Sequence, residues 1–147
     1  MTISSYGLSL ILAIIACVIG GVLGGLTLAR PGSVLGLTRL DGDPDAPPAT
    51  GLATEGRALG GLLILSHAAT ALFLGYQSSV GAAMAFALAM AWLGASLGRA
   101  ASVLIDKPRS KLNLTNLAFE VLIAVTLCLP FFNPGRLVVL RGHGMLV

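Results

Sequence analysis

Residues 54–73, TEGRALGGLLILSHAATALF, decide the fold of this chain. The stretch has the length that a membrane-crossing helix needs, about 20 residues, and it is apolar apart from Glu55 and Arg57 at its start and His67 near its middle. An ionisable side chain inside such a segment is expensive and usually faces protein. The stretch therefore predicts a transmembrane helix whose polar residues face neighbouring helices.

The composition of the whole chain agrees with a membrane location. The 147 residues are 56% hydrophobic and only 10% charged, whereas a soluble domain carries about 25% charged residues. The net charge of +3 comes from a few loop and helix-end residues, so we interpret it as topology and lipid contact and exclude nucleic-acid binding. Cys17 and Cys128 lie in apolar runs without metal-ligand spacing, so no metal site is predicted.

Four apolar stretches predict an all-α fold, a four-helix transmembrane bundle in a single membrane domain that covers residues 1–147. The expected spans are residues 7–29, 55–75, 79–98 and 112–132, with a loop at 30–54 and an apolar tail at 133–147. Thr54 is the expected N-cap of the second span. The link YQSS after this span is short, so the second and third spans should form an antiparallel hairpin.

The distribution of Lys and Arg predicts the orientation. Arg30, Arg39 and Arg57 flank the first loop, and four more basic residues flank the loop between the third and fourth spans, whereas the N-terminus and the YQSS link have none. By the positive-inside rule both of these loops face the cytoplasm, and both termini lie on the non-cytoplasmic side.

Polar residues at the cytoplasmic ends of three spans predict one cluster. Asn116 and Glu120 are one turn apart on the fourth span, and a buried carboxylate there needs a cation or a proton. The available cations are Arg57 and Arg99. The predicted cluster contains Glu55, Arg57, Arg99, Ser102, Asn116 and Glu120. It is either a clamp between helices or a pocket for an anionic or quinone-like head group, with the arginines as donors.

His67 shares one helix face with small residues above and below it, which include Gly60 and Ala71. The imidazole is either a hydrogen-bonded contact between helices or a ligand to haem or chlorophyll. The other histidine, His143, lies in the tail, so a bis-histidine haem has no second ligand. We favour the helix contact, we disfavour haem and chlorophyll, and we predict no cofactor apart from a lipid or quinone at the polar cluster.

Three features predict assembly with other membrane subunits. The tail at 133–147 is apolar but too short to span a membrane, no catalytic signature is present, and small residues repeat at helical spacing. The repeats are at Gly20, Gly21, Gly24, Gly25, Gly94 and Gly98. We therefore expect a non-catalytic accessory or structural subunit of a larger membrane complex, such as an energy-converting one, with membrane lipids and other subunits as partners. The alternative is a lipid- or quinone-binding protein or redox enzyme that uses the polar cluster.

Short motifs resemble those of a known family. They are Glu55-Gly56-Arg57-Ala58 followed by Gly60-Gly61, Gly98-Arg99 followed by Ser102, Asp106 and Pro108, and Glu120 in the last span. With these motifs the chain resembles a bacterial family of small four-span integral membrane proteins of unknown function with an architecture like that of the DoxX-like group. The resemblance implies a four-helix bundle in the bacterial inner membrane and brings no catalytic residues.

Overall fold

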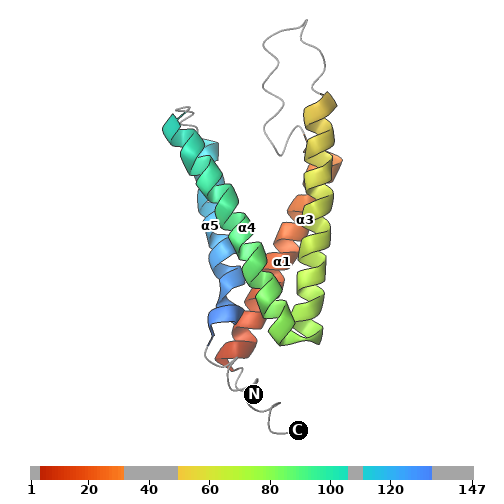
Figure 1. Cartoon of the computed structure of the whole chain (residues 1–147), viewed down its shortest axis with the longest axis vertical. Helices are drawn as coiled ribbons and strands as arrows, with labels where there is room; N and C mark the ends of the chain where they lie inside the picture. Colours follow the sequence, from red (N-terminus) through yellow and green to blue (C-terminus); the bar gives the residue numbers. More distant parts are fainter. Residues whose placement is uncertain (1–3, 32–49, 106–110, 134–147) are drawn as a thin grey trace, which may run out of the picture. The chain divides into compact units, whose positions relative to one another are not determined.

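The computed structural model of the chain describes residues 4–31, 50–105 and 111–133, and most of them lie in four long helices (Figure 1). The helices are α1 (Ser5–Ala29), α3 (Thr50–Tyr76), α4 (Ser78–Ile105) and α5 (Lys111–Phe132). Within these ranges no residue is part of a β-strand. The predicted all-α class is thus confirmed for the described residues, and the sidedness of the termini stays a prediction.

All four helices are long and apolar enough to cross a membrane. The spanning segments are Ser5–Ala29, Ala53–Tyr76, Ser78–Ala101 and Leu114–Phe132. At 1.5 Å per residue, the 25 residues of α1 are about 37 Å long, compared with about 30 Å for the hydrocarbon core of a bilayer. A helix also satisfies its backbone hydrogen bonds internally, as lipid requires. The chain is therefore a multi-pass membrane protein.

The helices extend beyond the predicted spans. α3 begins at Thr50, so Thr54 lies inside the helix and its interpretation as an N-cap is wrong. α4 continues past the predicted end at residue 98 to Ile105. The predicted limits follow apolar composition, whereas helical backbone bonding continues into polar segments. α5 ends at Phe132, directly before the predicted stop at Asn133-Pro134-Gly135. Residues 32–49 of the predicted loop and 134–147 of the predicted tail lie outside the described residues.

The link between α3 and α4 is shorter than the predicted YQSS, because Gln77 alone separates the two helices. Its backbone N–H donates to the Phe73 carbonyl at 2.8 Å, and its carbonyl accepts from the Gly81 N–H at 2.9 Å. A Cβ at Gly81 would collide with the backbone of Phe73 and Leu74. Gly81 thus allows the start of α4 to lie directly against the end of α3, which forms a tight helical hairpin.

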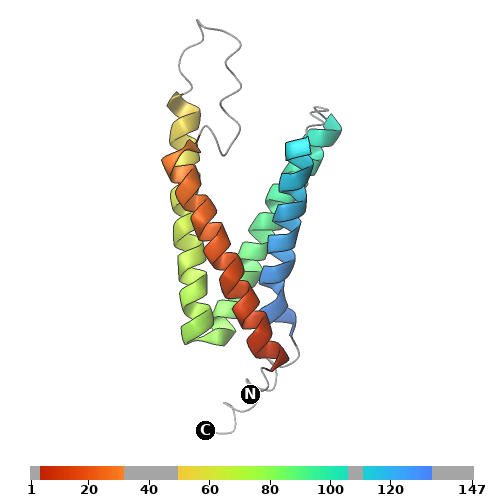
Figure 2. The same cartoon turned by 180° about the vertical axis from the view of Figure 1, so that it is seen from behind.

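The chain divides into two compact units, one formed by residues 1–16 and 70–147 and the other by residues 17–69. We call them the larger and the smaller unit. In the larger unit α4 lies beside α5 in both views (Figures 1 and 2). Ala82, Ala85 and Ala89 of α4 and Ala124 of α5 are fully buried. Small side chains let helix backbones approach closely, which favours association in lipid. The single membrane domain predicted from the sequence stays a prediction.

Aromatic side chains join α4 to the end of α5 in the larger unit. Phe86 stacks on Phe131 with ring centroids 4.5 Å apart, and Phe132 packs edge-on against Phe86 at 5.6 Å. Just beyond α5, the Asn133 side-chain amide donates to the backbone carbonyl of Ser5 at 3.1 Å. These contacts fix the end of α5 to both α4 and the start of α1.

The smaller unit is built on glycines of α1 and α3. A Cβ at Gly60 would lie 2.8 Å from the Gly24 carbonyl oxygen and 2.5 Å from the Leu28 nitrogen, and a Cβ at Gly24 would lie 2.9 Å from the Gly60 oxygen. The two backbones are therefore in contact at these positions. The Gly20 and Gly24 repeat of the first span accordingly mediates close helix packing, as its spacing predicts.

Candidate functional site

The candidate site is an ion pair between α4 and α5. The Arg99 Nε donates to Glu120 Oε1 at 2.6 Å. The Glu120 side chain is 5% exposed and that of Arg99 is 39% exposed. Both residues lie inside the apolar spanning segments of their helices, where a single unpaired charge would be costly. Arg99 is thus the cation that pairs with the buried Glu120 carboxylate.

Local helix geometry positions Arg99. Trp92 precedes Arg99 by seven residues and so lies on the same face of α4. Its ring packs edge-on against Phe119, the neighbour of Glu120, with centroids 6.3 Å apart. Between Trp92 and Arg99, the Ser96 hydroxyl bonds back to the Trp92 carbonyl at 3.0 Å. The aromatic contact therefore holds α4 against α5 about two turns before Arg99 on α4 and next to Glu120 on α5.

The second carboxylate oxygen of Glu120 makes no hydrogen bond. Oε2 is buried and has no partner, and among the described side chains only the Tyr6 hydroxyl shares this condition. A buried polar atom without a partner costs about 1–3 kcal/mol, and more for a charged group. The ion pair thus gives a hydrogen bond to one carboxylate oxygen of Glu120 and leaves the other oxygen without one.

The other residues of the predicted cluster have different environments. Asn116 lies one turn before Glu120 on α5 and is half-buried. The Ser102 side chain lies outside the described part of the structure, although its backbone is helical. Glu55 and Arg57 are exposed on α3 within the smaller unit. The structure thus brings Arg99 and Glu120 together, and the membership of Glu55, Arg57, Ser102 and Asn116 in one cluster stays a prediction.

His67 lies in the smaller unit and is fully buried. Its Nδ1 donates to the Leu63 carbonyl one turn earlier, at 2.7 Å, which fixes the ring against its own helix. The ring fills the space beside Gly20 of α1, so that a Cβ at Gly20 would collide with the imidazole. His67 thus packs against α1 within the smaller unit, and the choice between a helix contact and a pigment or haem ligand stays a prediction.

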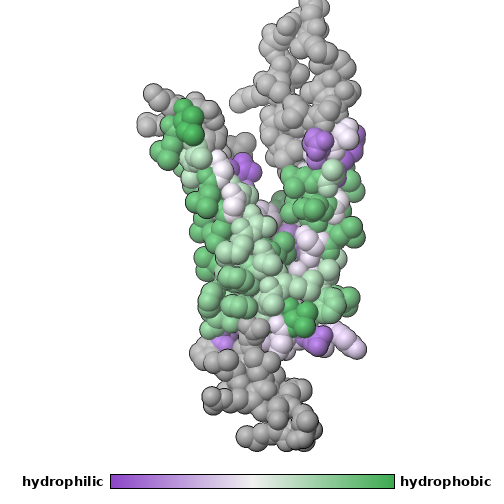
Figure 3. Space-filling model, viewed as in Figure 1, coloured by the Kyte–Doolittle hydropathy of each residue, from purple (hydrophilic) through white to green (hydrophobic). Residues whose placement is uncertain are grey.

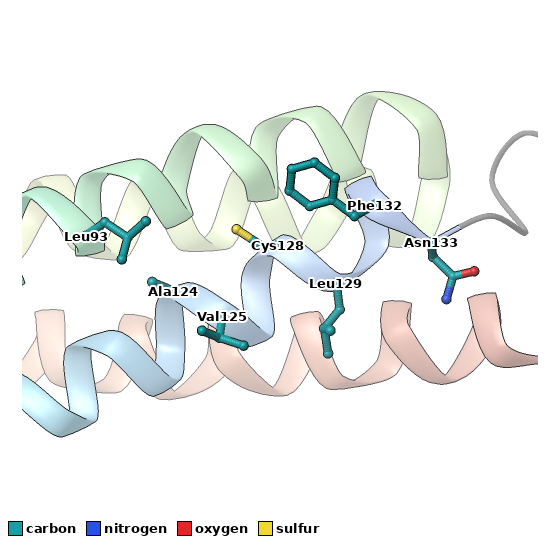
Figure 4. A pocket seen from close by; sticks show the side chains of 7 residues that line it. All are labelled: Leu93, Ala124, Val125, Cys128, Leu129, Phe132 and Asn133. Carbon is teal, nitrogen blue, oxygen red and sulfur yellow. The ribbon is translucent and has the colours of Figure 1, made fainter.

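A pocket of about 320 Å³ lies between α4 and α5 in the larger unit (Figure 4). Leu93 comes from α4, the other helical lining residues come from α5, and Asn133 lies at one end. The lining residues are Leu93, Ala124, Val125, Cys128, Leu129, Phe132 and Asn133. Among the described lining residues only Cys128 and Asn133 have polar side-chain atoms, and none of these residues is charged.

Two features of the larger unit were not predicted from the sequence. The seven-residue step from Trp92 to Arg99 places both on one helix face and could have indicated the contact between Trp92 and Phe119. No sequence pattern indicates that the Tyr6 hydroxyl is buried, because a tyrosine near the start of a span is typical of the membrane interface. Among the described residues, no three His, Cys, Asp or Glu side chains are grouped to hold a metal ion.

Four apolar helices of membrane-spanning length, two of them joined by an ion pair, define a small polytopic membrane protein. Residues 7–130 match the family described as Domain of unknown function (DUF4345), and the chain belongs to that family. The match begins in α1 and ends in α5, so it covers all four described helices. No curated protein and no solved structure matches the chain.

Proposed function

We propose that the chain is a non-catalytic accessory subunit of a larger membrane protein complex, and that one face of α4 binds a helix of a partner subunit. The partner class that we propose is an energy-converting complex, respiratory or photosynthetic. The proposal rests on the residue types that α4 exposes.

The exposed side of α4 has a row of alanine and glycine beside bulky side chains, which include Met90, Leu97 and Leu104. Six exposed small residues follow one another in steps of three or four and so share one side of the helix. They are Ala83, Ala87, Ala91, Gly94, Gly98 and Ala101. A Cβ added at Gly94 or Gly98 would meet no atom within 4 Å. Figure 3 shows pale colours over α4, where this small-residue face lies. We call it the α4 face.

The exposed residues of α1 have a different character. They include Ile11, Ile15, Val18, Val22 and Leu26, which are between 45% and 58% exposed. Bulky aliphatic side chains of this kind suit contact with lipid tails. Both helices thus expose bulky side chains, but only α4 also has a continuous row of exposed small residues, and this row supports a protein partner for α4.

Helix association in lipid supports this assignment. Lipid tails are as apolar as leucine, so membrane helices associate through close van der Waals packing, which small residues permit. The chain already uses this chemistry on the opposite side of α4, where Ala82, Ala85 and Ala89 are fully buried. A partner helix on the α4 face would make the same kind of contact.

The finer features of the proposal extend the sequence-based expectations. We propose a location in the bacterial inner membrane, with both termini on the non-cytoplasmic side. We also propose kinship with the DoxX-like group, which rests on the motifs at Glu55, Arg57, Arg99 and Glu120.

Co-purification from native membranes tests the proposal. The tagged full chain, extracted in a mild detergent, should retain defined membrane subunits, and the double variant Gly94→Leu, Gly98→Leu should lose them while keeping its helical content. The matched control adds bulk to the α1 surface through Val18→Leu and Val22→Leu, and it should retain the partners. A stable lone monomer, or partners that survive the α4 variant, would contradict the proposal.

A further inference from the structure

The pocket between α4 and α5 has the size of a ligand-binding site. Its volume of about 320 Å³ lies within the range of pockets that bind small molecules, about 300–1,000 Å³. In Figure 4, Leu93 and Ala124 lie at one end of the pocket and Asn133 lies at the other. None of the described lining residues is charged. The pocket therefore suits an uncharged, apolar group.

The two ends of the pocket lie at different depths of the membrane. Ala124 directly follows residue 123, the midpoint of the spanning segment Leu114–Phe132, whereas Asn133 directly follows the end of that segment. The helix rises about 14 Å from Ala124 to Asn133, and half of the hydrocarbon core of a bilayer is about 15 Å. The pocket thus extends from the middle of the membrane to one surface, which is the depth that the acyl chains of one leaflet occupy.

The rim of the pocket is exposed at the surface of the helix pair. Val125, Leu129 and Phe132 all line the pocket and are all exposed. The atoms that line an empty space lose van der Waals contacts on that side, so filling the pocket is favourable. Acyl chains are the apolar groups that surround a membrane-spanning helix. An acyl chain can therefore enter the pocket sideways from the bilayer.

The helices on both sides of the pocket are fixed to each other. Pro130 lies inside α5 at the level of the pocket and has no N–H, so α5 lacks one backbone hydrogen bond there. Proline is a common cause of helix kinks, and a helix that is not straight leaves space beside its neighbour. Directly after Pro130, the Phe131 ring stacks on Phe86 of α4 with centroids 4.5 Å apart. The pocket is thus part of a packed helix pair, and its shape exists before a ligand enters.

We propose that this pocket binds one acyl chain of a membrane lipid from the leaflet at the Asn133 end of α5. The methyl end of the chain points toward Leu93 and Ala124, and the ester end lies near Asn133. Lipid tails are as apolar as the lining residues, so the chain is held by closer van der Waals packing than the free bilayer gives it. The head group stays outside the pocket. The site therefore selects for an acyl chain and not for a head group.

Photo-crosslinking of the full chain in phosphatidylcholine vesicles tests this site. The probe is a phosphatidylcholine with a diazirine at the methyl end of one acyl chain. It should label Leu93 about threefold more than Leu122, because van der Waals contacts are individually weak. Leu122 is the matched reference, since it is exposed, lies next to the midpoint of α5 and does not line the pocket. A phosphatidylglycerol probe with the same acyl chain should give the same labelling.

Two variants and one control connect the labelling to the pocket. Leu93→Phe adds bulk at the inner end of the pocket and should lower the labelling of Ala124 and Cys128. Cys128→Leu fills the middle of the pocket and should lower the labelling of Leu93, which keeps the test open if Leu93→Phe does not fold. The control Leu97→Phe makes the same change one turn later on α4, at an exposed residue outside the pocket, and should leave the labelling unchanged.

Three results would overturn the proposal. Equal labelling of Leu93 and Leu122 in the wild type would show that the probe only samples the lipid around the protein. Unchanged labelling in folded Leu93→Phe and Cys128→Leu variants would show that the chain lies elsewhere. Labelling by one of the two probes alone would show that the head group, and not the acyl chain, determines binding.

Discussion

The Nε of Arg99 donates a hydrogen bond to Glu120 Oε1 at 2.6 Å and joins α4 to α5 inside their apolar spans. The two residues are 21 positions apart in the sequence, so the pair depends on the packing of two separate helices. The strength of the pair therefore reports whether α4 and α5 are correctly packed against each other.

A double-mutant cycle measures the strength of this pair. Arg99→Gln and Glu120→Gln should each lower the free energy of unfolding, and the double variant should lose less than the sum, because each single change leaves the other side chain without its partner. We expect a coupling of about 0.6–2 kcal/mol, since hydrogen bonds between membrane helices are modest and Arg99 is 39% exposed. Unfolding in mixed micelles gives the value. Strictly additive effects would show that the pair contributes nothing to the packing of α4 on α5.

Gly20 should tolerate no larger residue, because a Cβ there would collide with the His67 ring. The ring cannot turn away freely, since Nδ1 is bonded to the Leu63 carbonyl. Gly20→Ala should therefore lower the free energy of unfolding by about 1–3 kcal/mol, as overpacking does. A thermal or denaturant titration in detergent measures the change.

Gly21 provides the matched control for this prediction. A Cβ at Gly21 would meet nothing within 4 Å, so Gly21→Ala should be neutral or slightly stabilising through helix propensity. His67→Ala should restore part of the stability of the Gly20 variant. If Gly20→Ala and Gly21→Ala change the free energy of unfolding equally, Gly20 does not pack against His67 as described.

Gly81 should be equally sensitive at the hairpin between α3 and α4. A Cβ there would meet the backbone of Phe73 and Leu74, which cannot move aside as a flexible side chain can. Gly81→Ala should open the hairpin and lower the melting temperature, whereas Gly75→Ala, which has open space at its Cβ, should not. Melting curves of the two variants, followed by circular dichroism, measure the difference. An unchanged melting temperature of Gly81→Ala would contradict the tight link at Gln77.

The helices could be predicted from the sequence because apolar runs of bilayer length have few alternatives in lipid. Their ends could not. Arg99 lies past the predicted end of the third span, yet α4 continues to Ile105, because backbone hydrogen bonding does not depend on apolar side chains. Similarly, Thr54 resembles a cap in the sequence but lies within a helix that begins at Thr50.

The candidate site could be predicted in part. Helical spacing and the cost of a buried carboxylate indicated that Glu120 needs a cation or a proton, and Arg99 was one of two candidate cations. The choice between Arg99 and Arg57 depends on which helices pack together, and periodicity within a single helix does not contain that information. The contact of His67 with Gly20 could not be predicted for the same reason, because it depends on which helices pack together. The small residues on the same face as His67 indicated only that some helix would cover this face.

Site-specific photo-crosslinking in native membranes tests the proposed subunit role most directly. A photoreactive amino acid at Ala87 or Ala91, on the α4 face, should form a crosslink to one defined membrane protein, and the same group at Ile15 or Val22 of α1 should label lipid. Lipid labelling from all four positions would contradict the proposed role, because it would show that the α4 face contacts the bilayer and not a partner helix.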